Sequence, residues 1–133
     1  MKKLRGYIFS RQFMGERVPQ HVQNIVIRNY CEKNRYFFLL SSVEYKMENS
    51  FYMLKQVLNE LKNLDGVIAY SMFQLPEDDN ERLKILKKII NYKKEIHFAV
   101  EDLRIKNTSE IEKLQDIWLI KKNLKFCPRS FSV

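Results

Sequence analysis

The chain has 133 residues, and its 24 Lys and Arg against 16 Asp and Glu give a formal net charge of +8. Hydrophobic residues make up 45% of it and aromatic residues 13%, with only three Gly and three Pro. These values exclude a disordered or low-complexity chain and fit one globular domain. No apolar run approaches the roughly 18–20 residues of a membrane span, and no signal-peptide core follows the basic N-terminus. We therefore expect a cytoplasmic protein.

The first half of the chain alternates apolar runs with amphipathic segments. Residues 4–10 predict a buried strand, and the polar residues 11–18 predict a loop. A helix is expected over 19–34, because Pro19 suits a first helical turn and apolar residues then recur at helical spacing. An aromatic-rich strand over 36–40, a polar loop over 41–49 and an amphipathic helix over 50–61 should follow.

The second half repeats this pattern. We expect a strand over 66–71, a helix after the acidic loop 74–79, a strand over 96–100 and a helix begun by a capping box of Ser109 and Glu112. The strand and helix order predicts an α/β fold, a small doubly wound and mostly parallel four-stranded sheet of the flavodoxin-like kind. One domain should span residues 1–122. The tail 123–133 lacks periodicity and either covers the domain or contributes to a homodimer contact.

The positive charge favours a polyanionic partner, but the lysines are scattered, mostly beside acids on predicted helix faces. A solvated surface and a working basic patch both remain open, and the scatter counts against DNA binding. Cys31 and Cys127 lie too far apart in the sequence to suggest a disulfide, and Cys31 is expected to pack in the core. His97 lies within a predicted strand and should also be a core residue. Two histidines are too few for a zinc site, so we expect no metal and no cofactor.

In an open α/β sheet, ligands bind beyond the carboxyl ends of the strands. The loop after the first strand carries Arg11 and Arg17 on either side of a glycine and leads into a helix start at Gln20. Two guanidinium groups beside a helix N-terminus suit a phosphate or carboxylate, although both arginines could instead pair with nearby acids. The chain has neither a dinucleotide-binding GxGxxG motif nor a P-loop.

The same edge of the predicted sheet carries candidate catalytic residues. Ser10 ends the first strand, and His21 is a candidate base for it. Glu44 and Glu101, which follow other strands, are candidate acid/base groups. The catalytic candidates are thus Ser10, His21, Glu44 and Glu101. The ligand-binding candidates are Arg11, Arg17, Gln20, Ser71 and Gln74, of which Ser71 and Gln74 would bind hydroxyl groups.

The element order and several motifs over residues 4–120 resemble the catalytic domain of serine recombinases, the resolvases and invertases. The resemblance rests on Gly6-Tyr7 in the first strand, Gln20 before the first helix and the segment 65–68 at the third strand. It implies a resolvase-like fold. The family's catalytic arginine falls on Phe9 and its nucleophilic serine on Arg11, and its arginine-rich segment is replaced by residues 71–76. These departures argue against strand exchange.

A second resemblance is to the bacterial sporadic carbohydrate cluster proteins. It is carried by the runs 5–11 and 13–24 and by the segments 64–67 and 70–76, and it spans nearly the whole chain. It implies a role in making or modifying an unusual sugar of a bacterial surface polysaccharide, beside other proteins of that pathway. The resemblance supplies a context and no mechanism.

Three functions follow as hypotheses. The first is a sugar-pathway protein, either a binding protein or an enzyme, that binds a phosphorylated or nucleotide-linked sugar at the strand ends. The second is a nucleic-acid-binding or regulatory module on a resolvase-like scaffold, prompted by the charge. The third is a non-catalytic partner subunit, because the loops hold aromatic residues and methionines suited to an interface or to a pocket wall. These are Phe13, Met14, Met47, Met72 and Phe73.

Overall fold

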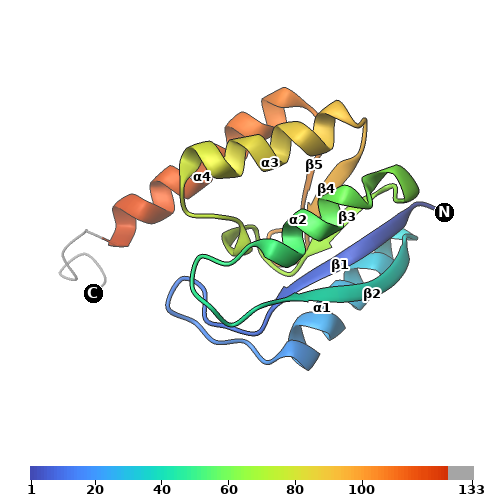
Figure 1. Cartoon of the computed structure of the whole chain (residues 1–133), viewed down its shortest axis with the longest axis horizontal. Helices are drawn as coiled ribbons and strands as arrows, with labels where there is room; N and C mark the ends of the chain where they lie inside the picture. Colours follow the sequence, from blue (N-terminus) through green and yellow to red (C-terminus); the bar gives the residue numbers. More distant parts are fainter. Residues whose placement is uncertain (126–133) are drawn as a thin grey trace.

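Five strands form a single sheet in the order β2-β1-β3-β4-β5, as seen in the computed structural model of the chain, which describes residues 1–125 (Figure 1). The strands are β1 Lys3–Phe9, β2 Phe37–Glu44, β3 Gly66–Ala69, β4 Glu95–Phe98 and β5 Leu103–Ile105. The α-helices are α1 Gln20–Asn34, α2 Tyr52–Asn59, α3 Asp79–Asn91 and α4 Thr108–Lys125. Short 3₁₀ helices at Leu61–Asn63 and Met72–Gln74 flank β3. The doubly wound α/β prediction is therefore confirmed.

The two faces of the sheet hold separate apolar clusters, because side chains alternate along each strand. Leu4, Ile8 and Ile68 pack against Ile27 and Cys31 of α1 on one face. The apolar cluster on the opposite face is larger. Helices α2, α3 and α4 cover that face, and α1 alone covers the first face (Figure 1). Cys31 is buried and its thiol is free, as expected of a core residue, and burial raises its pKa to about 11.

The sheet has one strand more than predicted. Strands β2, β1, β3 and β4 are parallel, as expected, but β5 follows a tight turn and pairs antiparallel with β4. Asp102 in that turn has a positive φ of 51°, which lets the chain reverse directly after β4. Three residues are too few to show a strand period, so the sequence pattern missed β5.

Strand β2 and helix α4 extend further along the chain than predicted. Strand β2 continues through Glu44, where a loop was expected from Ser41 onward. Ser41 is tolerated there because its hydroxyl donates to the Asn24 side chain at 2.7 Å. Helix α4 runs through Lys125, so residues 123–125 of the predicted tail are helical, while Cys127 and the rest of that tail lie outside the described residues.

The expected capping box of α4 is displaced by two residues. Asn107, rather than Ser109, accepts the hydrogen bond from the Glu110 backbone N–H at 3.0 Å. The Glu110 carboxylate in turn accepts from the Lys106 backbone N–H at 3.0 Å. Asparagine is among the strongest N-cap residues, so it begins the helix earlier than the Ser and Glu spacing indicated.

A buried polar cluster joins the amino ends of the strands. His97 in β4 is fully buried, as predicted, and its ring nitrogens contact the Tyr30 hydroxyl at 2.7 Å and the Glu95 carboxylate. Lys2 donates to the other oxygen of Glu95. Each polar group therefore has a partner, which is the condition for burying it.

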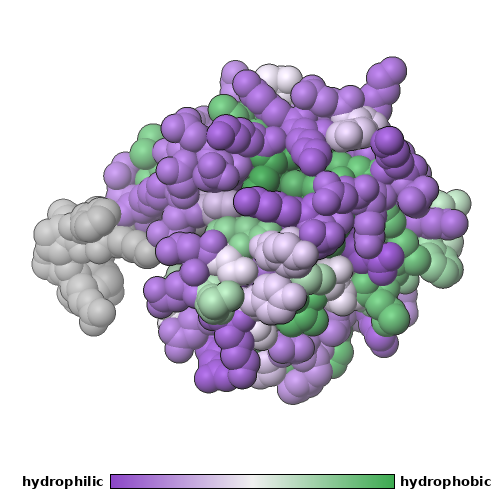
Figure 2. Space-filling view, viewed as in Figure 1, coloured by the Kyte–Doolittle hydropathy of each residue, from purple (hydrophilic) through white to green (hydrophobic). Residues whose placement is uncertain are grey.

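The face seen in Figure 2 is mainly hydrophilic, and its hydrophobic atoms appear as separate areas between charged side chains. The outer sides of α2 and α3 are therefore solvated, and their apolar residues point to the sheet. Across residues 1–125, no helix is both long enough and apolar enough to span a membrane.

Candidate functional site

The carboxyl edge of the sheet is held together by two buried glutamine side chains. Gln23 of α1 accepts a hydrogen bond from the Phe9 backbone N–H at 3.0 Å and donates to the carbonyl oxygens of Phe9 and Val18. Gln74 donates to the Gln23 side chain at 2.7 Å. Both glutamines are fully buried. Together they fix the loop after β1 against the loop after β3.

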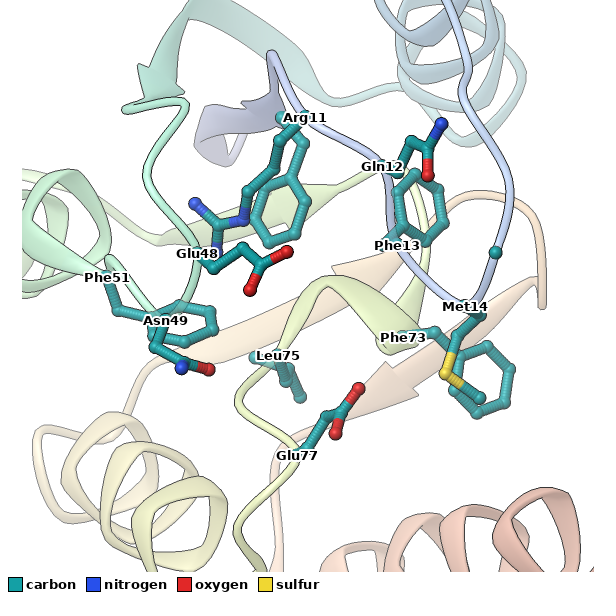
Figure 3. Close-up of a pocket in the computed structure, with 12 residues that line it drawn as sticks. Arg11, Gln12, Phe13, Met14, Glu48, Asn49, Phe51, Phe73, Leu75 and Glu77 are labelled. Atoms are coloured by element: carbon teal, nitrogen blue, oxygen red, sulfur yellow. The ribbon is translucent and has the colours of Figure 1, made fainter. Parts of the chain in front are cut away.

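A pocket of about 460 Å³ opens at this edge, within the size range of small-ligand sites. Three loops line it, the first after β1, the second between β2 and α2, and the third between β3 and α3 (Figure 3). We call it the three-loop pocket. Its lining residues are Phe9, Arg11, Gln12, Phe13, Met14, Gly15, Glu48, Asn49, Phe51, Phe73, Leu75 and Glu77.

Arg11 is a cation without an acidic partner in the part of the chain that the structure describes. Its guanidinium carbon lies 4.1 Å from the ring centroid of Phe9 and 5.1 Å from that of Phe51, which holds the group by cation–π contact. One nitrogen donates to the Tyr45 carbonyl oxygen at 2.8 Å. An arginine has five N–H donors, so most of them remain available to a ligand.

The rest of the pocket combines aromatic walls with acidic side chains. Phe13 packs edge-on to Phe9 at 5.8 Å between ring centroids, and Phe51 lies across the pocket from it. The side chains of Glu48 and Glu77 extend into the space between these walls from two different loops (Figure 3). Such a pocket can stack an apolar ring face while its charged groups bind polar substituents.

The predicted pair of Ser10 and His21 is not brought together as a catalytic pair. The Ser10 hydroxyl donates to the Glu44 carbonyl oxygen at 2.8 Å, which ties β1 to β2. His21 is exposed on the first turn of α1, and among the described residues no hydrogen bond joins it to Ser10. The geometry gives Ser10 a structural partner in place of a base.

Glu44 is buried and binds five donors. Its carboxylate accepts from the hydroxyls of Tyr7 at 2.9 Å and Ser50 at 3.2 Å and from the Tyr45 backbone N–H at 3.0 Å. The backbone N–H groups of Met53 and Leu54 also donate to it at 3.1 Å each, so the Glu44 side chain caps the first turn of α2. Burial, together with this carboxylate, raises the pKa of Tyr7 well above its ordinary value.

The side chains of Glu101 and Ser71 are hydrogen bonded to each other. The Ser71 hydroxyl and the Met72 backbone N–H donate to the two oxygens of Glu101, each at 2.8 Å. Gln74 completes a capping box with Ser71 and is buried beneath the third loop. These three predicted site residues are close together, but they shape the loop that carries Phe73 and do not line the pocket.

Arg17 and Gln20 are exposed and do not line the pocket either. The loop turns between Phe13 and Glu16, which are joined by two backbone hydrogen bonds of 2.9 and 3.0 Å, with Gly15 at a positive φ of 76°. Arg17 follows this turn. Of the nine predicted site residues, Arg11 alone lines the three-loop pocket.

Sequence reasoning missed the acidic and amide residues of the second and third loops. Glu48, Asn49 and Glu77 lie several residues beyond their strand ends, so the strand-end rule did not select them. The long polar stretch 41–49 was the available signal, since it is unusually long for a simple connection. Within residues 1–125, no group of three or more His, Cys, Asp or Glu side chains is arranged to hold a metal ion.

Solved structures of recombinase domains share this fold. The N-terminal catalytic domain of TP901-1 integrase matches with a TM-score of 0.65 and 15% identity, over 90% of this chain and 98% of that one. A resolvase family site-specific recombinase from Streptococcus pneumoniae matches with a TM-score of 0.66 and 11% identity, over 92% of this chain and 91% of that one. The chain therefore has a resolvase-like fold, and at these identities the likeness shows the fold alone.

No protein-family model matches the chain, and no curated protein matches it significantly. The resemblance to the carbohydrate cluster proteins thus remains a prediction.

Proposed function

We propose that the protein binds a phosphorylated or nucleotide-linked sugar in the three-loop pocket. Its role would be in the biosynthesis of a bacterial surface carbohydrate. The observation that carries this proposal is the half-buried Arg11, whose guanidinium faces a cavity without an acidic partner in residues 1–125. Such a group recognises an anion by charge-assisted hydrogen bonds. The biosynthetic setting rests on the sequence resemblance, which implies that the protein acts beside other proteins of that pathway.

The other lining residues suit the sugar itself. Phe13 and Phe51 offer flat apolar surfaces to the carbon-bound hydrogens of a pyranose ring. The side chains of Gln12, Asn49 and Glu48 carry the amide and carboxylate groups that hydrogen bond to hydroxyls. These residues would hold the sugar in position.

A nucleic-acid-binding module is the second candidate, because the chain carries a net charge of +8 on a resolvase-like fold. One feature of the sequence argues against strand exchange. The serine position of the recombinase pattern holds Arg11, and Ser10 lies one place early, so no serine stands at the position of the family's nucleophile.

A thermal-shift screen separates these candidates. The purified protein is heated with sugar phosphates, nucleotide sugars or short duplex DNA at low and moderate salt. A ligand that binds only the folded state raises the melting temperature by mass action. We expect a shift with a sugar phosphate that persists at moderate salt, since DNA binding through phosphates weakens steeply as salt rises.

Variants at two arginines locate the binding site. Arg11→Met should abolish the shift, whereas Arg17→Met, a matched change outside the pocket, should leave it intact. A shift with DNA alone would support the second candidate. No shift with any compound would support a partner subunit, which a pull-down would then identify.

A further inference from the structure

Strand β2 is the long open edge of the sheet. It is the outermost strand beside β1, and no strand of residues 1–125 pairs with its other side (Figure 1). The opposite edge is β5, which has only three residues and carries the charged Arg104. Strand β2 has eight residues, so it exposes a longer row of backbone polar groups. An open edge of this length is a template for a further strand.

The backbone polar groups of β2 face alternately toward β1 and toward the open side. The Phe37 backbone N–H donates to the Lys2 carbonyl oxygen at 2.8 Å, which is the β1 side. By the alternation of a strand, the N–H and carbonyl groups of the next residue, Phe38, face the open side. A second extended chain supplies the donors and acceptors that these groups require.

The sequence of β2 lacks most features that protect an open edge. Native edge strands carry charged residues, above all lysine, or proline, or they are very short. The run 36–43 has no charged residue and no proline, in a chain of which 30% is charged. A bulge opposite Gly6 follows Leu39, and the Leu40 carbonyl oxygen within it accepts from the Arg5 side chain at 2.9 Å. The run Phe37–Leu39 before the bulge keeps a regular register and is open to pairing.

Large apolar side chains are exposed along the same edge. Leu40 is 73% exposed, more than any other leucine of the described residues. Neighbouring segments extend this apolar surface, since Tyr45 and Tyr52 are half exposed and their ring centroids lie 5.8 Å apart. The other exposed apolar residues of β2 are Phe37 and Val43. Exposed apolar residues that gather in this way are typical of a protein interface.

The charge of the chain favours this edge for contact between two copies. Each copy carries a net charge of +8, so two copies repel each other wherever cations line their contact. Helix α4 also exposes apolar residues, among them Leu119 and Ile120, but Lys121 and Lys122 follow them directly. The uncharged run of β2 adds no such repulsion. A second copy also supplies an edge with the same unpaired groups, which a two-fold axis brings together.

We propose that two copies of the chain pair through β2, antiparallel, and join their sheets into one continuous sheet. The outward-facing N–H and carbonyl groups of each copy bond to those of the other, and the exposed side chains of Phe37, Leu40 and Val43 are buried between them. This surface is separate from the three-loop pocket, so the proposal goes beyond sugar binding and does not depend on it.

Sedimentation velocity of the whole chain, over a wide range of protein concentrations, measures the association. We expect the mass of two chains at the higher concentrations. Added salt should strengthen the association, because it screens the repulsion between two positive copies and leaves apolar and backbone contacts in place. Binding to DNA would show the opposite dependence on salt.

A matched pair of leucine variants locates the contact. Leu40→Lys places a charge on the open edge, as natural edge strands do, and should weaken dimerisation by at least about tenfold. Leu119→Lys, at an exposed leucine of α4, should leave the dissociation constant unchanged within about twofold. Circular dichroism of each variant checks that it is folded.

Hydrogen exchange distinguishes strand pairing from a contact between side chains alone. The backbone amide of Phe38 faces the open side, so it should be protected in the dimer and exchange rapidly in Leu40→Lys. The amide of Leu39, which faces β1 by the same alternation, should stay protected in both and serves as the internal reference.

Three results would overturn the proposal. The first is a single-chain mass at every concentration, which would leave the edge to a strand of another protein. The second is a dimer that Leu119→Lys dissociates and Leu40→Lys does not, which would assign the contact to α4. The third is a dimer in which the Phe38 amide still exchanges rapidly.

Discussion

The side-chain amides of Gln23 and Gln74 are hydrogen bonded to each other at 2.7 Å beneath the three-loop pocket. Gln23 also bonds both backbone groups of Phe9, and Gln74 accepts from the Ser71 backbone N–H at 3.3 Å. Two segments that are 51 residues apart in the sequence are thereby joined at the point where β1 and β3 end. The pocket rests on this connection, since Phe9 and the loop after β3 form two of its walls.

Replacing Gln23 with leucine should destabilise the fold. The change leaves the backbone groups of Phe9 and the amide of Gln74 buried without partners, at a cost of about 2–4 kcal/mol in the free energy of unfolding. Urea denaturation measures this loss. Gln20→Leu, at an exposed position of the same helix, should change the free energy by less than about 0.5 kcal/mol. Equal effects of the two substitutions would show that the amide network is not stabilising.

Glu44→Gln should also destabilise the protein. An amide places an NH₂ group where the carboxylate accepts from Tyr7 and from the first turn of α2, so at least one donor loses its acceptor. We expect a loss of about 1–3 kcal/mol in the free energy of unfolding. Glu32→Gln, which changes an exposed glutamate of α1, is the control. Wild-type stability of Glu44→Gln would contradict a structural role for this residue and reopen a catalytic one.

Stability should fall as the pH drops below about 6.5. Burial lowers the pKa of His97 below its ordinary 6.5, although the Glu95 carboxylate opposes this. Below pH 6.5 the unfolded chain therefore takes up a proton that the folded histidine resists, and folding is penalised. Burial alone would raise the pKa of Glu95, but hydrogen bonds from Lys2 and His97 hold it below its ordinary 4.5. Its contribution is present above pH 4.5 and is lost as the pH falls through the folded value.

Urea midpoints between pH 4 and pH 8 measure this dependence. His97→Gln should be less stable at pH 7, and its midpoint should change less between pH 5 and pH 6.5 than that of the wild type. His21→Gln, which alters the other, exposed histidine, should retain the wild-type slope. A wild-type midpoint that rises on acidification would contradict the assignment of a neutral, buried His97.

Arg82→Lys should loosen the third loop. The Arg82 guanidinium is fully buried, stacks on Trp118 at 4.2 Å and donates to the carbonyl oxygens of Pro76 and Glu77. A lysine ammonium lacks the planar fork that makes these bonds together. The free energy of unfolding should fall by about 2–4 kcal/mol, and the backbone amide hydrogen of Glu77 should exchange faster with deuterium. Lys88→Met, on the exposed side of α3, should leave both measurements unchanged.

The alternation of strands and helices was predictable because each buried strand is a continuous apolar run, and because apolar residues recur every three to four positions along each helix. Strand β2 was predicted too short, since Ser41 and Ser42 are polar and lie on an edge strand, where one side of the chain meets solvent. Strand β5 was missed because three residues carry no period. Local patterns therefore identify central elements better than edge elements.

The candidate site was predictable only in part. Arg11 was selected because it follows a strand end, and that rule depends on topology alone. Glu44 and Glu101 were selected for the same reason, but long-range donors from Tyr7 and Ser71 bind their carboxylates, and no sequence pattern records such contacts. Glu77 comes from a loop whose path is set by Arg82. Its place in the pocket depends on tertiary packing.

The most direct test of the account is to locate a bound sugar phosphate on the chain. Backbone amide resonances are assigned by NMR and followed while glucosamine 6-phosphate is added to the wild type and to Arg11→Met. We predict that the largest shift changes in the wild type fall on residues 11–15, 48–51 and 73–77, the three loops of the pocket, and that Arg11→Met removes them. Shift changes centred on the lysines of α4, or unaltered in Arg11→Met, would contradict the assignment of the pocket as the binding site.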